Sequence, residues 1–170
     1  MVGLRPFRCY RRVKRAYTRK SKYKAKGYIK AVPTSKIVKF NYGNTRKEFP
    51  SKVNLFCKQR IQIRHNAIES ARVMVVRKLN KVLGRNYHFQ IRLYPHHILR
   101  ENKMITGAGA DRMQTGMQHA FGKAMGLAAQ VKPKQAIFTV HAEKEAIPHI
   151  RAALKACTYK LPCKCGIEVL

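Results

Sequence analysis

Acidic side chains are scarce in this sequence. The 170 residues include 7 Asp and Glu against 37 Lys and Arg, a formal net charge of +30, and the first acid is Glu48. Charge of one sign repels itself in a compact fold, so we expect a polyanion to be the normal environment. The few scattered carboxylates also leave little for acid–base catalysis, and no Cys–His pair stands out as a nucleophile. We therefore predict no enzyme activity.

A long hydrophobic run is also missing. No apolar stretch approaches the roughly 20 residues that span a bilayer. The basic N-terminus is not followed by the apolar segment of a secretory signal. Of the three polyanions that compete, an anionic membrane, an acidic protein and nucleic acid, the membrane is the easiest to exclude, and we expect no membrane partner.

Cysteine is sparse. The five cysteines are odd in number and irregularly spaced, which indicates reduced thiols in the cytosol. Cys157, Cys163 and Cys165 with a histidine could supply four metal ligands, but the second C-x2-4-C pair typical of zinc sites is absent. We expect neither a metal nor another cofactor.

Residues 1–30 are rich in cations and contain interleaved aromatic residues. Cations neutralise phosphates and aromatic rings stack on unpaired bases. Because disordered tails are poor in aromatic residues, we expect a basic arm that becomes ordered on RNA rather than a solvated tail. The expected RNA-binding residues of the arm are Arg5, Arg8, Tyr10, Arg11, Arg12, Lys14, Arg15, Arg19, Lys20, Lys22 and Lys24.

Hydrophobic periodicity predicts the elements of residues 31–170. The expected elements are strands at 36–40, 53–57, 60–64 and 88–94, a turn at 41–44, a helix at 66–84, a hairpin of 127–131 with 136–141, a helix at 144–157 and a strand at 167–170. In the first helix, Asn66 and Glu69 suggest a capping box and Gly84 a C-cap. The apolar stripes are Ile68, Ala71, Val75, Leu79 and Val82, then Ile147, Ile150, Leu154 and Cys157.

This order of elements indicates one α+β domain. We expect a two-layer sandwich, with two helices packed on one face of a mixed, mainly antiparallel sheet. The predicted organisation is an arm at 1–30 and a single domain at 31–170, from which the loop 102–116 protrudes. Pro148 suits the first turn of the second helix.

The loop at 102–116 contains Gly107, Gly109 and Gly116. Glycines tolerate backbone angles that other residues avoid, so this segment is a poor helix and a poor strand. Their spacing does not fit the G-x-G-x-x-G motif of dinucleotide sites. Because long loops in compact domains are usually functional or disordered, we predict a finger that the domain holds out toward RNA.

The same residues carry a family resemblance. The segment Asn102-Lys-Met-Ile-Thr-Gly-Ala-Gly-Ala-Asp-Arg-Met-Gln-Thr-Gly-Met117, continued by Ala120-Phe-Gly-Lys123, resembles the large-subunit ribosomal proteins called L16 in bacteria and L10e in archaea and eukaryotes. Arg5-Pro6 with Arg8-Cys9-Tyr10-Arg11 resembles the arm of that family, and Phe89 to His97 resembles the strand before its finger. The resemblance covers nearly the whole chain.

The resemblance implies a two-layer fold bound to large-subunit rRNA, with neighbouring ribosomal proteins as partners and no stable homo-oligomer. The finger is expected to reach the peptidyl-transferase centre and to help position tRNA in the aminoacyl and peptidyl sites. The residues it places there are Arg100, Lys103, Met104, Gly107, Gly109, Asp111, Arg112, Gln114, Thr115 and Gly116. Further RNA contacts are expected at Arg92, His96, His97 and Lys123.

Two departures from the family pattern are visible. Ala124 stands where the family commonly has proline after Phe-Gly-Lys, so the turn there is expected to differ. The chain stops at Leu170, without the long extension of eukaryotic members, which favours an archaeal-type protein.

Two other functions compatible with the basic surface stay open at this point. An RNA-modifying or RNA-processing enzyme requires a pocket with a perturbed acid, base or thiol. A DNA-binding chromatin protein requires similar affinity for duplex DNA and structured RNA.

Overall fold

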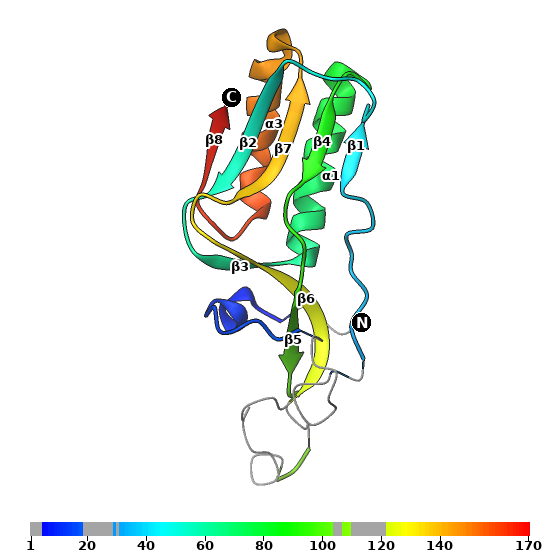
Figure 1. Ribbon diagram of the computed structural model, residues 1–170. Helices are drawn as coiled ribbons and strands as arrows, with labels where there is room; N and C mark the ends of the chain where they lie inside the picture. The colour runs from blue at the N-terminus through cyan, green and yellow to red at the C-terminus, as the bar shows by residue number, and fades with distance from the viewer. Residues whose placement is uncertain (1–4, 19–28, 30, 104–106, 110–121) are drawn as a thin grey trace.

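The computed structural model describes residues 5–18, 29, 31–103, 107–109 and 122–170, and these form two connected sheets and two helices (Figure 1). A five-stranded sheet has the order β1-β4-β7-β2-β8, and a three-stranded sheet has the order β3-β6-β5. The recorded strand pairs are all antiparallel in this part of the chain. The strands are β1 (Asn41–Gly43), β2 (Ser51–Cys57), β3 (Ile61–Arg64), β4 (His88–Ile91), β5 (His97–Glu101), β6 (Lys123–Val131), β7 (Ala136–Ala142) and β8 (Cys165–Val169).

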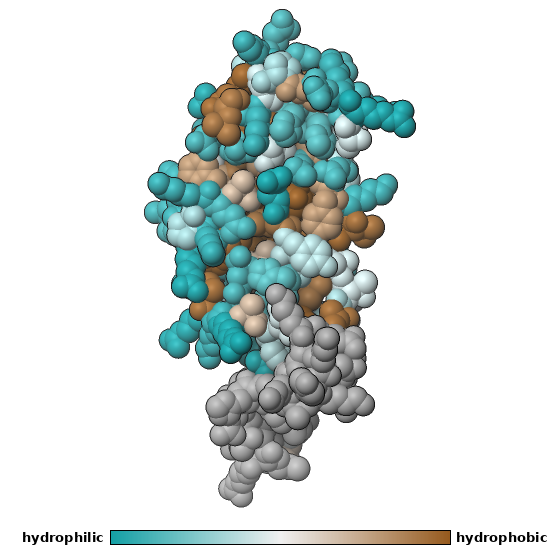
Figure 2. All heavy atoms as spheres, in the orientation of Figure 1, coloured by the Kyte–Doolittle hydropathy of each residue, from teal (hydrophilic) through white to brown (hydrophobic). Residues whose placement is uncertain are grey.

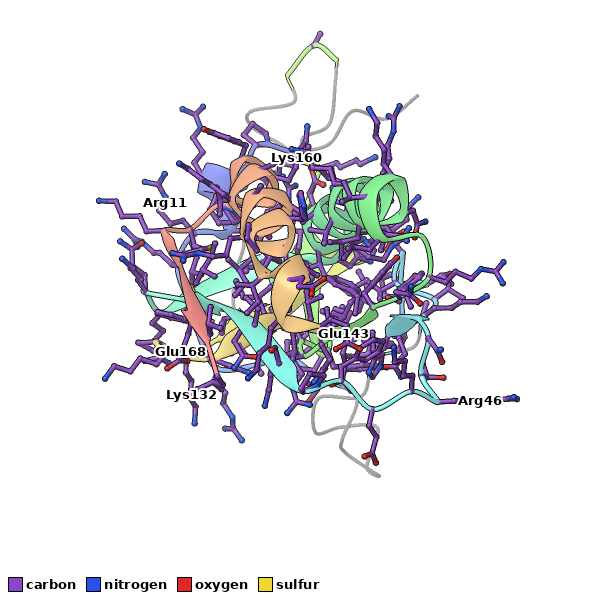
Figure 3. All side chains as sticks on the ribbon, turned by 90° about the horizontal axis from the view of Figure 1, so that it is seen from above. Arg11, Arg46, Lys132, Glu143, Lys160 and Glu168 are labelled. Carbon is purple, nitrogen blue, oxygen red and sulfur yellow. The ribbon has the colours of Figure 1, made fainter. Side chains whose placement is uncertain are left out.

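Two helices cover one face of the five-stranded sheet, as the α+β prediction requires (Figures 1 and 3). They are α1 (His65–Leu83) and α3 (Ile147–Cys157), and they contact each other. The single-turn helices η1 (Phe7–Tyr10), η2 (Lys144–Ala146) and η3 (Thr158–Lys160) complete the elements. Each long helix buries one stripe, Ile68, Ala71, Val75 and Leu79 in α1 and Ile150, Ala153, Leu154 and Cys157 in α3.

The core lies between these helices and the alternate residues of the sheet. Phe89 and Ile91 of β4 and Phe138 and Val140 of β7 are buried, and the rings of Phe89 and Phe138 lie 5.2 Å apart. Burial of such large apolar side chains is the main favourable contribution to folding. Because the core is filled by apolar side chains, most of the described surface that Figure 2 shows is hydrophilic.

The hairpin predicted for 127–131 and 136–141 is wrong. In the structure β6 pairs with β3 and β5, whereas β7 pairs with β2 and β4. The turn after Val131 does not fold the chain back on itself, because Lys134 donates its N–H to the Cys57 carbonyl and Gln135 accepts from the Cys57 N–H. The segment 51–64 therefore pairs with 128–142 as one ribbon that bends from one sheet into the other.

Several local predictions need correction. No strand forms at 36–40, and the expected turn at 41–44 contains β1, which pairs with β4. The segment 97–101, expected to lead into the loop, is strand β5. The predicted strand 88–94 ends at Ile91.

The first helix also begins differently from the prediction. Its N-cap position is Arg64, with no side-chain capping bond, because β3 runs directly into α1. Glu69 binds Arg72 at 2.5 Å instead of reaching back to Asn66. Val82 is 53% exposed, whereas Leu83 packs against the core.

Other local predictions are confirmed. Gly84 ends α1 with φ of 58°, and Pro148 lies in the first turn of α3. Strands form at β2, β3 and β8, close to the predicted ranges. The turn chemistry and the apolar alternation were sufficient signals at these positions.

Gly43 is the glycine at which a side chain should be tolerated least. It has φ of 84°, and an added Cβ would lie 2.1 Å from the Tyr87 carbonyl oxygen. We expect Gly43→Ala to lower the free energy of unfolding by about 2–4 kcal/mol, through backbone strain and overpacking. Gly84→Ala is the matched control, because its Cβ would meet nothing within 4 Å. We expect it to lower the free energy of unfolding by only about 1 kcal/mol, the cost of the left-handed backbone angle. Urea unfolding of both variants checks this, and equal losses would contradict it.

Candidate nucleic-acid interface

The basic arm lies on the three-stranded sheet. Tyr17 is the main point of attachment, since its N–H donates to His97 Nδ1 at 2.8 Å and its carbonyl accepts the N–H of Ile98 at 2.9 Å. The Tyr17 ring also lies under the guanidinium of Arg100, 4.0 Å from Cζ to the ring centroid. The arm therefore joins the edge of the sheet at β5.

Side chains from β3 and β6 hold the rest of the described arm by its backbone carbonyls. Arg64 donates to the Arg5 carbonyl at 2.7 Å, Gln62 donates to that of Tyr10, and Gln130 donates to that of Lys14 at 2.9 Å. In the structure residues 5–17 contact the domain, and the expectation that RNA orders the arm stays a prediction. Gln62 and Arg64 of β3 face the arm and satisfy carbonyls that no regular element would satisfy.

This attachment leaves the cations of the arm exposed. The exposed side chains are Arg8, Arg11, Arg12, Lys14 and Arg15, and Arg11 projects away from the domain in Figure 3. Tyr10 is different, because it is partly buried and has the guanidinium of Arg64 over its ring at 5.6 Å. Burial, and secondly the charge of Glu101, raise the pKa of Tyr10, which keeps its hydroxyl protonated.

A basic groove of about 560 Å³ runs between the arm and β5. Arg8, Arg12, Lys14, Arg15 and Arg100 line it together with His97, and none of the described lining residues is acidic. Guanidinium groups that converge in this way are suited to bind phosphate oxygens in pairs. We call this feature the basic groove.

The two adjacent histidines have different roles in the structure. His96 is exposed, whereas His97 points inward and accepts the Tyr17 N–H. Burial is the largest cause that lowers the pKa of His97, followed by the charges of His96 and Arg100. His97 is therefore an attachment point for the arm as well as part of the groove lining, whereas the His96 ring is exposed.

The base of the predicted finger is an antiparallel strand pair. Arg100 of β5 faces Ala124 of β6, and Glu101 faces Lys123. Arg5 lies 3.9 Å from Glu101, so the arm contacts the same place. Alanine at position 124 is compatible with pairing inside this ladder, whereas proline lacks the backbone N–H.

Part of the predicted site falls outside the described residues. This holds for Arg19, Lys20, Lys22 and Lys24 of the arm and for Met104, Asp111, Arg112, Gln114, Thr115 and Gly116 of the loop. Gly107 and Gly109 are described, and Gly109 has φ of 74°. The structure brings Arg5, Arg8, Arg100 and Lys123 to one end of the molecule, whereas Arg92 lies beyond β4 and bonds Gln90.

Three residues that position the site were not predicted from the sequence. They are Gln62, Arg64 and Gln130, which bind the arm carbonyls. Gln62 and Arg64 alternate with the buried Ile61 and Ile63, so a polar face on β3 was visible in the sequence. What that face would bind was not visible, because the arm lies more than fifty residues away along the chain.

Four of the five cysteines lie near one another in the domain, whereas Cys9 is exposed on the arm. Cys163 Sγ and Cys165 Sγ lie 3.5 Å apart, and both cysteines pack against the core cluster that contains Cys57 and Cys157. Burial is the main cause that raises the pKa of Cys157 to about 12. Across the described residues, no three His, Cys, Asp or Glu side chains are arranged to hold a metal ion. The described helices also include none with the length and apolar character needed to cross a membrane.

Comparison with known proteins identifies the family of this chain. The family model for ribosomal protein L16p/L10e matches residues 13–168. The chain belongs to the L16p/L10e family of ribosomal proteins. This family assignment also agrees with the resemblance seen in the loop and arm sequences.

Named relatives come from archaea, as the archaeal-type expectation requires. "Large ribosomal subunit protein uL16" of Methanococcus aeolicus is 48% identical over 99% of this chain and 95% of its own length. The protein of the same name from Methanosphaerula palustris is 49% identical over 93% of this chain and 89% of its own. The protein of the same name from Hyperthermus butylicus is 45% identical over 98% of this chain and 93% of its own length.

The attachment of the arm should weaken in acid. His97 accepts a hydrogen bond only when Nδ1 is unprotonated, and its pKa in the folded protein is lowered. The attachment should therefore be complete above the ordinary histidine pKa of about 6.5 and be lost progressively as the pH falls below it. Hydrogen exchange of the Tyr17 and Ile98 amides, corrected for intrinsic rates, measures this.

Neighbouring His96 provides the control. We expect His97→Gln to remove the pH dependence of exchange and His96→Gln to keep it. An unchanged pH dependence in His97→Gln would show that another group controls the attachment.

Proposed function

We propose that this protein is a structural constituent of the large ribosomal subunit that binds large-subunit rRNA. The observation that carries the proposal is the basic groove, whose described lining residues include several cations and no acid, on an arm that contacts the domain. Cations fixed in place before binding lose less conformational entropy when they meet phosphates. The family and the printed names of the relatives support the same function.

This role is that of a structural component and not of an enzyme. The protein acts in the ribosome of the cytoplasm, beside neighbouring ribosomal proteins, and does not form a stable homo-oligomer. Its exposed cations extend beyond the groove, since Arg46, Lys132 and Lys160 also project outward in Figure 3. Such a distribution is suited to a protein surrounded by RNA on several sides.

We infer a second contact for the loop 102–116, with tRNA near the peptidyl-transferase centre. Three features support this inference: the loop lies in sequence between the paired strands β5 and β6, Arg100 and Lys123 flank its base, and its sequence resembles the family finger. In this role Lys103 and Arg112 contact phosphates near the tRNA ends, and the glycines permit a close approach of backbone to RNA. The loop thereby helps to seat tRNA in the aminoacyl and peptidyl sites.

The groove should determine the salt dependence of rRNA binding. We expect replacement of Arg8, Arg12 and Arg15, which line the groove, by Gln to reduce the log–log salt slope by about 2–3, since each lost phosphate contact contributes up to about 0.9. Filter binding or fluorescence anisotropy with large-subunit rRNA over a range of salt concentrations measures this slope.

A variant with the same charge loss elsewhere separates the groove from the net charge. Arg151, Lys155 and Lys160 are exposed on the side of α3, and their replacement by Gln should change the slope by less. Equal slopes in the two variants would contradict the assignment of the groove. Equal affinity for duplex DNA in competition would instead favour a chromatin protein.

Deletion of the finger should impair the function of the protein without unfolding it. We expect replacement of residues 107–116 by a short Gly-Ser linker to change the free energy of unfolding by less than about 1 kcal/mol, because the loop lies outside the described core. Translation or subunit joining should nevertheless slow, as a reconstituted translation assay and sucrose-gradient sedimentation would measure. Unfolding of the shortened protein would show that the loop belongs to the core.

A further inference from the structure

A second cavity lies beside the basic groove, between the arm, the start of α1 and the β5–β6 pair. Its volume is about 230 Å³. This is several times the roughly 30 Å³ that one water occupies in the liquid and below the roughly 300 Å³ at which drug-sized sites begin. We call it the arm cavity. Its size suits a single flat ring system.

One wall of the arm cavity is apolar. Leu99 of β5 and Met125 and Leu127 of β6 form it. The register between these strands shifts after Leu99, so that Gly126 faces Leu99 while Ala124 faces Arg100. The residue between them, Met125, is the extra residue of a β-bulge and is 44% exposed. Bulges of this kind re-aim a side chain and are over-represented next to functional sites.

The opposite wall is polar and contains unused hydrogen-bonding groups. His65 Nδ1 accepts the Lys36 N–H at 3.2 Å. Burial, then the charges of Lys36 and Arg64, lower the pKa of His65, so the neutral ring carries its proton on Nε2. This atom points toward Gly126, because a Cβ added to that glycine would lie 3.7 Å from it.

Asn66 supplies the complementary group. Its Oδ1 atom is buried and has no hydrogen-bond partner within the described part of the chain. Buried polar atoms are nearly always paired in folded proteins, so such an atom calls for a ligand. The polar wall therefore offers one donor, His65 Nε2–H, and one acceptor, Asn66 Oδ1.

Charged groups complete the rim of the arm cavity. Arg5 and Glu101 form their ion pair at 3.9 Å, and Arg64 lies over the Tyr10 ring. A ligand that enters here meets guanidinium groups at the mouth and an apolar wall with a donor–acceptor pair inside. A phosphate fits only the rim of such a site, whereas a base fits the interior and its own phosphate fits the rim.

From these features we propose that the arm cavity binds a single unstacked nucleobase of the RNA that passes along the basic groove. The base lies against Leu99, Met125 and Leu127 and presents one acceptor to His65 Nε2–H and one donor to Asn66 Oδ1, which the Asn66 amide turns toward the cavity when the base enters. Its phosphate meets Arg5 or Arg64 at the rim. The proposal rests on the proposed rRNA-binding function and adds a specific base contact to a surface otherwise suited to phosphate.

Chemical probing of the complex between the full chain and large-subunit rRNA tests this proposal. The probes are dimethyl sulfate and a carbodiimide, which modify the hydrogen-bonding edges of unpaired bases. Wild-type protein should protect one base whose reactivity returns in Gly126→Val, because the valine side chain extends from β6 toward His65 and fills the cavity. The same variant should weaken rRNA binding roughly tenfold, the cost of one base contact.

Gly126→Ala is the matched control, since its single methyl group makes only an ordinary contact at 3.7 Å and should keep the protection. Asn66→Ala removes the acceptor without filling the cavity and should also return the reactivity, so the test does not depend on Gly126→Val folding. Protection that persists in both Gly126→Val and Asn66→Ala would overturn the proposal, as would the absence of any such protected base.

The proposed function fails in a different way. If the wild-type chain shows no salt-dependent rRNA binding, the rRNA-binding function itself is wrong. If rRNA binds and the groove variants reduce the salt slope, but no base responds to Gly126→Val or Asn66→Ala, only the base site is wrong.

Discussion

A single bent ribbon of paired backbone holds the two halves of the molecule together. Residues 51–64 pair with 128–142 through β2–β7 in one sheet and β3–β6 in the other. The hydrogen bonds of Cys57 with Lys134 and Gln135 keep the ladder together at the bend. The register of this strand pairing is strongly fixed, because a shift by one residue would move every buried side chain to the opposite face of the sheet. The position of the arm, the basic groove and the loop base all follow from this bend.

The two sheets that this ribbon joins have different roles. The five-stranded sheet with α1 and α3 carries most of the apolar core, in which residues such as Leu55, Val75 and Leu154 are fully buried. The three-stranded sheet has a smaller apolar cluster around Ile98 and instead binds the arm through side chains that reach backbone carbonyls. The exposed cations of the arm therefore lie beside this smaller sheet, where they repel one another. A polyanion that binds the outer sheet relieves this repulsion.

Agreement between sequence and structure was best where a signal was local. The stripe of α1, the alternation of Phe89 and Ile91, the cap at Gly84 and the motif of the loop could each be read from neighbouring residues. Predictions failed where a distant partner decided the outcome. Strand β1 exists because β4 lies beside it, and β6 avoids the expected hairpin because β3 and β5 pair with its two edges. Hydrogen bonds between distant segments leave no periodicity in the chain.

By itself, the sequence determined the α+β class, the strongly basic surface, the family and the absence of a complete catalytic or nucleotide motif, since composition and local pattern are sufficient for these. Only the tertiary structure decided that the arm lies on the domain, that His97 faces inward while His96 stays exposed, and that His65 and Asn66 meet the bulge at Met125 around one cavity. These outcomes depend on which side chains reach a backbone carbonyl or a neighbouring strand. Such contacts join residues that are far apart in the chain, so only the folded structure brings them together.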